Sequence, residues 1–139
     1  MSDEMKDWNA KVVAEFRANG GKVGDFGDAP LLILHTTGRK SGEDRISPLM
    51  YQALAGGSVA IFASKGGAPD HPDWYLNVVA DDSVTAEIGK ETRAFTAREA
   101  LGDERDGIWT RQKAAYPQFA GYEEATDRTI PVIVLDPTD

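Results

Sequence analysis

The loop HTTGRKSGEDR, residues 35–45, gathers cationic side chains directly after an apolar run. Arg39, Lys40 and Arg45 lie close together here, whereas the whole chain has a formal net charge of -8. Arginine offers paired donors to a phosphate or carboxylate, and lysine offers a compact positive charge. The loop lacks the spacing of a nucleotide-binding phosphate loop, and no helix is expected to follow it. It therefore predicts either a solvated turn or a site for an anionic group.

A second candidate is the segment FASKGGAPDHPDWYLN, residues 62–77. An expected strand delivers Ser64 and Lys65 to a Gly-Gly turn, where small residues let a ligand approach the backbone closely. Trp74 follows with polar neighbours at the start of an expected helix. Donors, a cation and aromatic surfaces so close together suit a planar heteroaromatic ligand with polar edges. A corner between strand and helix in which Trp74 fills the core explains the pattern equally well.

Aromatic residues recur every three positions near the C-terminus, in AYPQFAGYEEA. Tyr116, Phe119 and Tyr122 at this spacing usually indicate core packing on one face of a helix. Pro117 and Gly121 are expected to interrupt that helix, so a mobile aromatic flap over a pocket competes with the core interpretation.

The composition argues against several other chemistries. Two histidines, His35 and His71, are too few for a histidine-rich metal site, and no metal is expected. The absence of cysteine excludes disulfides, thiolate ligands and cysteine nucleophiles, and it is compatible with a reducing cytosol. No serine lies in a GxSxG elbow. The acidic balance argues against nonspecific nucleic-acid binding, which needs a basic face.

Hydrophobic periodicity predicts the elements that must position these residues. Residues 3–19 have apolar side chains at helical spacing, which predicts an amphipathic helix. Strands are expected at PLLILHTT, RISPLMYQAL, SVAIFAS and TIPVIVLDP, a hairpin at SVTAEIG and ETRAFTAREA, and helices at PDWYLNVVAD and GDERDGIWTRQKAAY. Pro48 marks the second strand as an edge or bulged strand. This order favours an antiparallel α+β barrel over alternating βαβ units.

The chain of 139 residues is expected to form a single domain, residues 1–139, with the N-terminal helix over 1–20 and the barrel core over 29–139. No apolar run approaches the roughly 20 residues needed to span a bilayer, and the charged N-terminus does not resemble a secretory signal. A cytoplasmic protein is therefore expected. The N-terminal helix is expected to cover one side of the domain. Weak peripheral membrane contact through this helix, or a roof over a substrate pocket, is the alternative.

Three segments, LLILHTTGRKSGEDRISPLMY, FASKGGAPDHPDWYLNVVAD and TDRTIPVIVL, resemble in order the deazaflavin-dependent nitroreductase family. These are small flavin/deazaflavin oxidoreductases, class A, that use coenzyme F420. The resemblance runs from about residue 29 to the C-terminus. It implies a mainly antiparallel split β-barrel with an N-terminal helix and short inserted helices, and a cofactor that carries a polyanionic phospholactyl-oligoglutamate tail.

The resemblance also implies which residues contact the cofactor. Arg39, Lys40, Ser41 and Arg45 would hold the tail. The remaining contacts would come from Ile46, Ser47, Pro48, Leu49, Met50, Phe62, Ala63, Ser64, Lys65, Asp73, Trp74, Tyr75, Leu76 and Asn77.

Reduced F420 would then transfer a hydride to a flat, electron-poor acceptor such as a quinone, an enone or lactone, or a nitroaromatic. Ser64 would place a hydroxyl near the reacting centre, and Tyr116, Phe119 and Tyr122 would form a wall on the acceptor side. Nitroreductase-type members typically carry tyrosine at the middle aromatic position. Phe119 lacks that hydroxyl, so weak nitroimidazole reduction is expected.

Two other functions fit the same segments. One is an FMN-dependent split-barrel reductase, and the other is a non-catalytic F420-binding or carrier protein. The three cations of the first loop favour F420, because FMN brings a single phosphate whereas the F420 tail adds carboxylates. The sequence does not indicate an oligomeric state.

Overall fold

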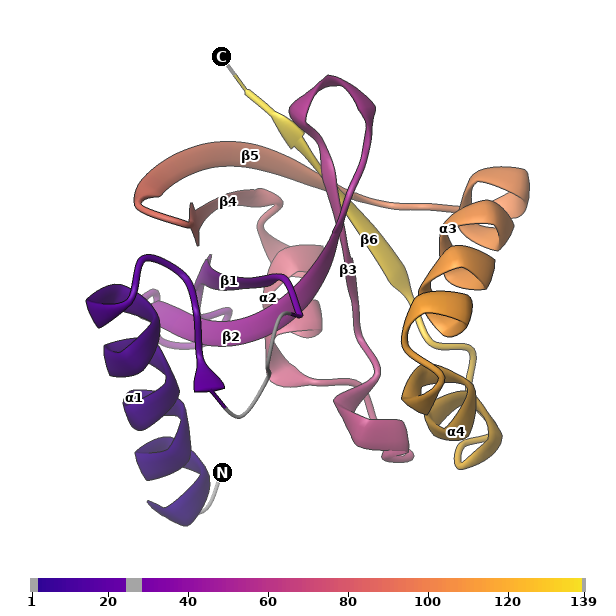
Figure 1. Ribbon diagram of the computed structural model, residues 1–139, viewed down its shortest axis with the longest axis horizontal. Helices are drawn as coiled ribbons and strands as arrows, with labels where there is room; N and C mark the ends of the chain where they lie inside the picture. Colours follow the sequence, from indigo (N-terminus) through magenta and orange to yellow (C-terminus); the bar gives the residue numbers. More distant parts are fainter. Residues whose placement is uncertain (1–2, 25–28, 139) are drawn as a thin grey trace.

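The computed structural model describes residues 3–24 and 29–138 and shows a barrel flanked by helices (Figure 1). The strands are β1 Leu31–Thr37, β2 Asp44–Ala53, β3 Val59–Phe62, β4 Ser83–Ile88, β5 Glu91–Glu99 and β6 Val132–Pro137. The α-helices are α1 Asp3–Ala18, α2 Asp73–Ala80, α3 Gly102–Ala115 and α4 Gln118–Glu124, and the short 3-10 turns are η2 Ala55–Gly57 and η3 Lys65–Gly67. The expected order of helices and strands is therefore confirmed.

The strands close into an antiparallel barrel in the order β1-β2-β3-β6-β5-β4. Strand β2 pairs with β1 over residues 44–50, but with β3 only over residues 51–53. Pro48 lies in the first part of β2, which pairs with β1 but not with β3. The N–H that proline lacks is therefore not needed for a second set of strand hydrogen bonds. This local edge confirms the expectation drawn from Pro48, and the fold is the expected α+β barrel.

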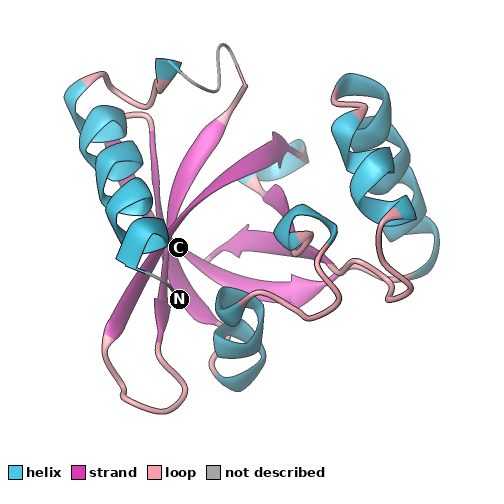
Figure 2. Ribbon diagram, turned by 90° about the horizontal axis from the view of Figure 1, so that it is seen from below, coloured by secondary structure: helices cyan, strands magenta, loops and turns pink. Residues whose placement is uncertain are grey.

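The barrel has a different helical cover on each side. Helix α1 lies on one side, and α3 with α4 lies on the other (Figures 1 and 2). The run Leu31, Leu32, Ile33, Leu34 of β1 is buried at every position, because alternate side chains face the barrel interior and the α1 layer. Burial on both faces explains why this strand is a continuous apolar run rather than an alternating one.

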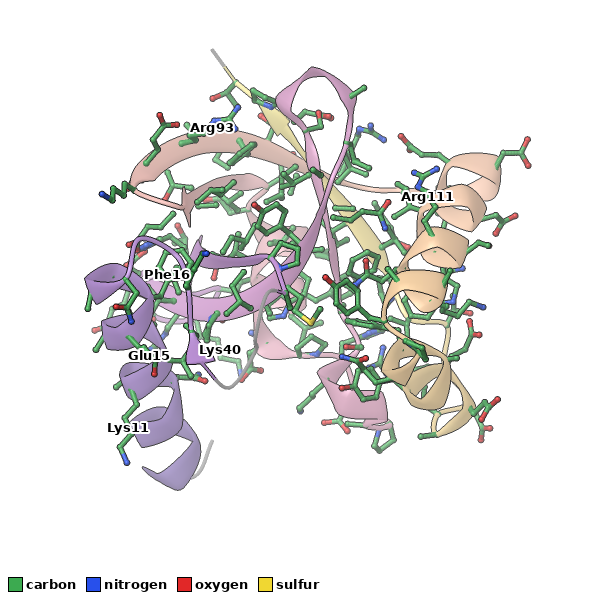
Figure 3. All side chains as sticks on the ribbon, in the orientation of Figure 1. Lys11, Glu15, Phe16, Lys40, Arg93 and Arg111 are labelled. Carbon is green, nitrogen blue, oxygen red and sulfur yellow. The ribbon has the colours of Figure 1, made fainter. Side chains whose placement is uncertain are left out.

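Helix α1 is an amphipathic cover for the barrel. Val12, Val13 and Phe16 are buried against Leu31 and Ile33, whereas Lys11 is exposed and points away from the domain (Figure 3). The side chains of residues 3–8, Trp8 among them, lie outside the described ones. Within residues 3–24 and 29–138, no helix is long and apolar enough to cross a membrane.

The expected interruption at Gly121 is wrong. Helix α4 runs through Gly121 without a break, and two residues, Tyr116 and Pro117, separate it from α3. A glycine inside a helix costs only about 1 kcal/mol relative to alanine. Burial of Phe119 against α3 and β3 offsets a cost of that size.

Candidate functional site

A cavity of about 710 Å³ opens beside the loop between β1 and β2. Its walls come from four parts of the fold: helix α1, the β1–β2 loop, the start of β2 and the start of α2. The lining residues are Asn9, Ala10, Gly38, Arg39, Lys40, Ser41, Asp44, Arg45, Ile46, Ser47, Asp73, Trp74 and Asn77. Nine of the residues predicted to contact a cofactor therefore share one cavity.

The β1–β2 loop is a tight turn that fixes where its cations point. Gly42 N donates to Gly38 O and Gly38 N donates to Glu43 O, both at 2.8 Å. Gly42 has φ 73, and a Cβ on Gly38 would lie 2.7 Å from Ser41 Oγ. Glycine is needed at 42 for the left-handed backbone and at 38 for space. The loop is thus a tight hydrogen-bonded turn whose residues 39–45 are exposed.

Arg39 is held in place by Asn77 of α2. Asn77 Oδ1 accepts from Arg39 Nη1 at 2.9 Å and from Arg39 N at 3.2 Å, and Asn77 Nδ2 donates to Thr36 Oγ1 at 3.3 Å. The side chain of Asn77 is 3% exposed. Asn77 therefore anchors the loop to α2. Because these hydrogen bonds already order the Arg39 side chain, binding of a ligand there costs little additional conformational entropy.

Lys40 and Arg45 supply the other two positive charges. Lys40 is exposed and lies between α1 and the barrel (Figure 3). Arg45 Nη2 lies 3.3 Å from Ser41 Oγ and 3.6 Å from Glu43 Oε2. Three cations converging on one cavity of an acidic chain fit an anionic ligand.

Two carboxylates also line the cavity, and each has a cationic or titratable partner. Asp73 Oδ1 lies 3.5 Å from Arg39 Nη2, and Asp44 Oδ2 lies 3.1 Å from Nδ1 of His35. The other ring nitrogen of His35 lies 2.6 Å from Glu87 Oε2. His35 thus belongs to a structural hydrogen-bond network, as expected for a histidine at a strand end.

Glu87 connects that network to α1. Arg17 donates to both carboxylate oxygens of Glu87, at 2.9 and 2.8 Å. These hydrogen bonds, opposed by partial burial and helped by His35, lower the pKa of Glu87 to about 2. The pair fastens α1, and with it the Asn9 and Ala10 wall of the cavity, to β4.

The segment after β3 forms a separate corner, residues 63–71, that carries Ser64 and Lys65. Ser64 is 9% exposed, and its hydroxyl does not cap the following 3-10 turn. Lys65 has φ 46, and within the described chain it is the one residue other than glycine with positive φ. A Cβ on Gly67 would lie 2.9 Å from Tyr122 O. The corner and α4, predicted separately as parts of the site, are therefore in direct contact.

The aromatic stripe divides between core and surface. Phe119 is 5% exposed and packs against Phe62, Trp109 and Tyr122, with ring centroids 5.5, 6.1 and 5.2 Å apart. Tyr116 and Tyr122 are only partly buried beside this cluster. The core interpretation is correct for Phe119, which the structure places inside the α3–α4 layer and not on an open wall.

The remaining predicted residues lie outside the lining of the cationic cavity. Pro48, Leu49 and Met50 continue along β2 and are half-buried, and Phe62 and Ala63 are buried at the end of β3. Leu76 is half-buried on α2.

Tyr75 and Trp74, also on α2, have packing roles that the sequence left open. The hydroxyl of Tyr75 donates to Glu99 Oε1 at 2.8 Å, and burial together with this bond raises the pKa of Tyr75 to about 12. Trp74 is 6% exposed within the barrel core and also borders the cavity. The core interpretation of Trp74 is therefore confirmed, and its contact with a ligand stays a prediction.

Sequence reasoning missed several residues that the structure brings to these sites. Asn9 and Ala10 reach the cavity because α1 packs beside β2. Asp44 lies within the cationic loop, directly before Arg45, and was not distinguished from other solvated acids. Arg128 contacts the 63–71 corner although it lies far along the chain. Only its place within the TDRTIPVIVL segment could have drawn attention to it.

The closed antiparallel barrel with its flanking helices matches the fold of a solved F420-dependent reductase, which defines the class of protein. The family model for F420H(2)-dependent quinone reductases matches residues 8–137, and the chain belongs to that family. It is an oxidoreductase whose cofactor is reduced coenzyme F420. The resemblance to deazaflavin-dependent enzymes is thus confirmed.

Similar proteins cover most of the chain. An F420H(2)-dependent quinone reductase of Mycobacterium tuberculosis strain H37Rv is 35% identical over 128 residues, which are 88% of this chain and 85% of that protein. The solved structure of an F420-H2 dependent reductase, FDR-A, is 44% identical with a TM-score of 0.69, covering 77% of this chain and 94% of that one. A structure described as a domain-swapped dimer is 38% identical with a TM-score of 0.71, covering 96% and 98%.

Proposed function

We propose that this protein reduces quinones with F420H2, and that the cavity beside the β1–β2 loop binds the anionic tail of the cofactor. The observation that carries the proposal is the convergence of Arg39, Lys40 and Arg45 on one cavity of a chain whose net charge is -8. Such a site suits a chain of negative groups better than a single phosphate, because the cations are spread along the loop and the start of β2.

The parts of the site divide the work between binding and reaction. The loop cations and Ser41 anchor the tail. Ile46 and Ser47 continue the cavity wall along β2 toward the barrel. The corner with Ser64 and Lys65 lies at the far end of β3, where it meets α4. We assign the cofactor ring and the acceptor to the region between this corner and the partly buried Tyr116 and Tyr122.

When bound, reduced F420 supplies the hydride, so the protein's task is orientation and electrostatics. Ser64 offers a hydroxyl that no helix cap consumes, and it can donate to a carbonyl oxygen of the acceptor as charge develops there. Tyr116 and Tyr122 offer flat surfaces for a planar ring. Lys65 adds a positive charge next to Ser64, although Asp70 lies 3.3 Å from its Nζ.

Quinones fit this site better than bicyclic nitroimidazoles. A quinone needs a flat apolar surface and a donor for each carbonyl oxygen as it is reduced. Phe119 offers no hydroxyl and is buried. We expect the Phe119→Tyr variant to raise nitro reduction, measured as F420H2 oxidation, only if α4 lets the new hydroxyl reach the acceptor. Unchanged or lower nitro turnover in a folded variant would show that this position does not contact the acceptor.

The decisive test of cofactor choice is a parallel fluorescence titration with F420 and FMN, followed by F420H2 oxidation with a panel of quinones and nitroaromatics. We expect F420 to bind more tightly than FMN and quinones to accelerate F420H2 oxidation. Tight FMN binding without a response to F420 would refute the proposal. Tight F420 binding without turnover on any acceptor would favour a carrier protein.

Two further features of the protein stay as predictions. The structure of a 38% identical chain is described as a domain-swapped dimer, and a dimer of this chain is one such prediction. Light scattering across a concentration range tests that assembly. Peripheral membrane contact through α1 has less support, because its described apolar residues pack on the barrel. Vesicle co-sedimentation measures it directly.

A further inference from the structure

The Arg128 side chain contacts three residues of the 63–71 corner. Its Nη2 donates to Ser64 O at 3.0 Å, and its Nε donates to Ala68 O at 3.0 Å. Its Nη1 lies 3.2 Å from Nδ1 of His71. One planar guanidinium thus spans the start, the end and the exit of the turn that carries Ser64 and Lys65.

The corner needs such a brace because its backbone is strained. Lys65 has φ 46, a left-handed conformation that costs a residue with a Cβ roughly 1–2 kcal/mol. The turn has two internal backbone hydrogen bonds, from Gly67 N to Ser64 O at 2.9 Å and from Ala68 N to Lys65 O at 3.1 Å. Strained residues persist only where the surroundings hold them, and they concentrate at functional sites.

The contact with His71 extends the brace to α2. A guanidinium cannot accept a hydrogen bond, so Nδ1 of His71 is the acceptor in this contact. The His71 ring lies against Tyr75, with centroids 4.6 Å apart. Arg128 therefore connects the segment before β6 to the corner and to the first turn of α2.

Arg128 has no described contact with the cations of the tail cavity. Its described side-chain partners are Ser64, Ala68 and His71, and none of them lines that cavity. Loss of Arg128 should therefore disturb the Ser64–Lys65 corner and leave the cationic cavity beside the β1–β2 loop intact.

We propose that Arg128 is a positioning residue that fixes the Ser64–Lys65 corner in the geometry needed for hydride transfer. The proposal rests on the proposed function for the role of Ser64. It assigns Arg128 no contact with the reacting atoms. Its effect should appear in kcat and in the environment of the bound cofactor ring, and much less in the affinity for the cofactor tail.

The test compares Arg128→Met, Arg128→Lys and Arg128→Ala with a matched control, Arg105→Met. Arg105 also donates to a backbone carbonyl, Ile130 O at 2.7 Å, and lies over the Trp109 ring, but it has no described contact with the corner. Thermal unfolding of all variants measures the purely structural cost. Hydrogen exchange of the Gly67 and Ala68 amides, without cofactor, reports directly on the corner.

We expect Arg128→Met to speed exchange at Gly67 and Ala68, shift the absorbance or fluorescence of bound F420, and lower kcat with a quinone at least tenfold. Its Kd for F420 should change less than threefold. Arg128→Lys should recover part of kcat, and added guanidinium should partly restore Arg128→Ala. Arg105→Met should show none of these changes beyond its own loss of stability.

Three results would overturn the proposal: unaltered kcat and unaltered exchange in Arg128→Met, parallel losses of kcat and F420 affinity, or losses no larger than those of Arg105→Met at equal stability. If wild-type protein does not oxidise F420H2 with any quinone, the proposed function fails first, and the effect of Arg128 on hydride transfer fails with it. In that case the exchange data still show whether Arg128 braces the corner.

Discussion

Replacement of both Arg39 and Lys40 by alanine should weaken F420 binding far more than binding of a deazaflavin that lacks the tail. Arg39 is 29% exposed and held by Asn77, so its hydrogen bonds to an anionic group are worth about 1.5–3 kcal/mol. Lys40 is exposed, and an ion pair at such a position contributes about 0.5–1 kcal/mol. At roughly 1.4 kcal/mol per tenfold change, the double variant should bind F420 about 30- to several-hundredfold more weakly.

The assay is fluorescence titration with F420 and with the tail-free deazaflavin, at low and high salt. Wild-type affinity for F420 should fall as salt rises, since the Debye length shortens, and the double variant should lose much of that dependence. The control is Lys90→Ala with Arg93→Ala, which removes the same charge from residues that do not line the cavity. Equal losses for both ligands, or an equal loss in the control, would refute the tail-site assignment.

Asn77→Ala should lower the free energy of unfolding by about 1–3 kcal/mol, because it leaves Thr36 without its buried partner and releases Arg39; chemical denaturation measures this, and unchanged stability would contradict the anchoring role. Glu87→Gln should lower the free energy of unfolding by about 1–2 kcal/mol at neutral pH. This is less than the Glu87 pKa of about 2 implies, because Arg17 is half-exposed and solvent screens the ion pair. Because the pKa of Glu87 is lowered on folding, its contribution is present above about pH 4.5 and lost as pH falls toward 2. Denaturation of wild type and variant should therefore converge in acid, and a constant gap would contradict the ion pair. Gly67→Ala should destabilise by more than about 1 kcal/mol, since φ is 86 and Tyr122 O blocks the added Cβ; an unchanged melting temperature would refute that contact.

Local pattern determined most of the fold. Alternation, apolar runs and turn residues predicted the strands, and Pro48 indicated a strand with a free edge. The pattern erred at Gly121, where a residue with poor helix propensity is held in α4 by the burial of its neighbour Phe119. Tertiary packing overrides propensity at such positions, so periodicity alone could not decide between a flap and a core helix.

The site was predictable only in its chemistry. The sequence predicted an anionic ligand for Arg39, Lys40 and Arg45, because local positive charge in a chain of net charge -8 is visible there. The packing of α1, β2 and α2 decides which residues line the cavity, and this packing is not visible in the sequence. Asn9 and Asp44 were therefore missed.

The sequence by itself determined the class of fold, the cationic loop and the segments that place the chain among deazaflavin enzymes. The tertiary structure decided what each side chain does within them. Asn77 anchors a loop that lies far from it along the chain, and Phe119 is core rather than wall. Arg128 donates a hydrogen bond to the strained turn at Lys65, although it lies 64 residues from Ser64 along the chain. The physical reason is that hydrogen bonds and burial depend on distances in space, which closure of the barrel sets and local sequence does not.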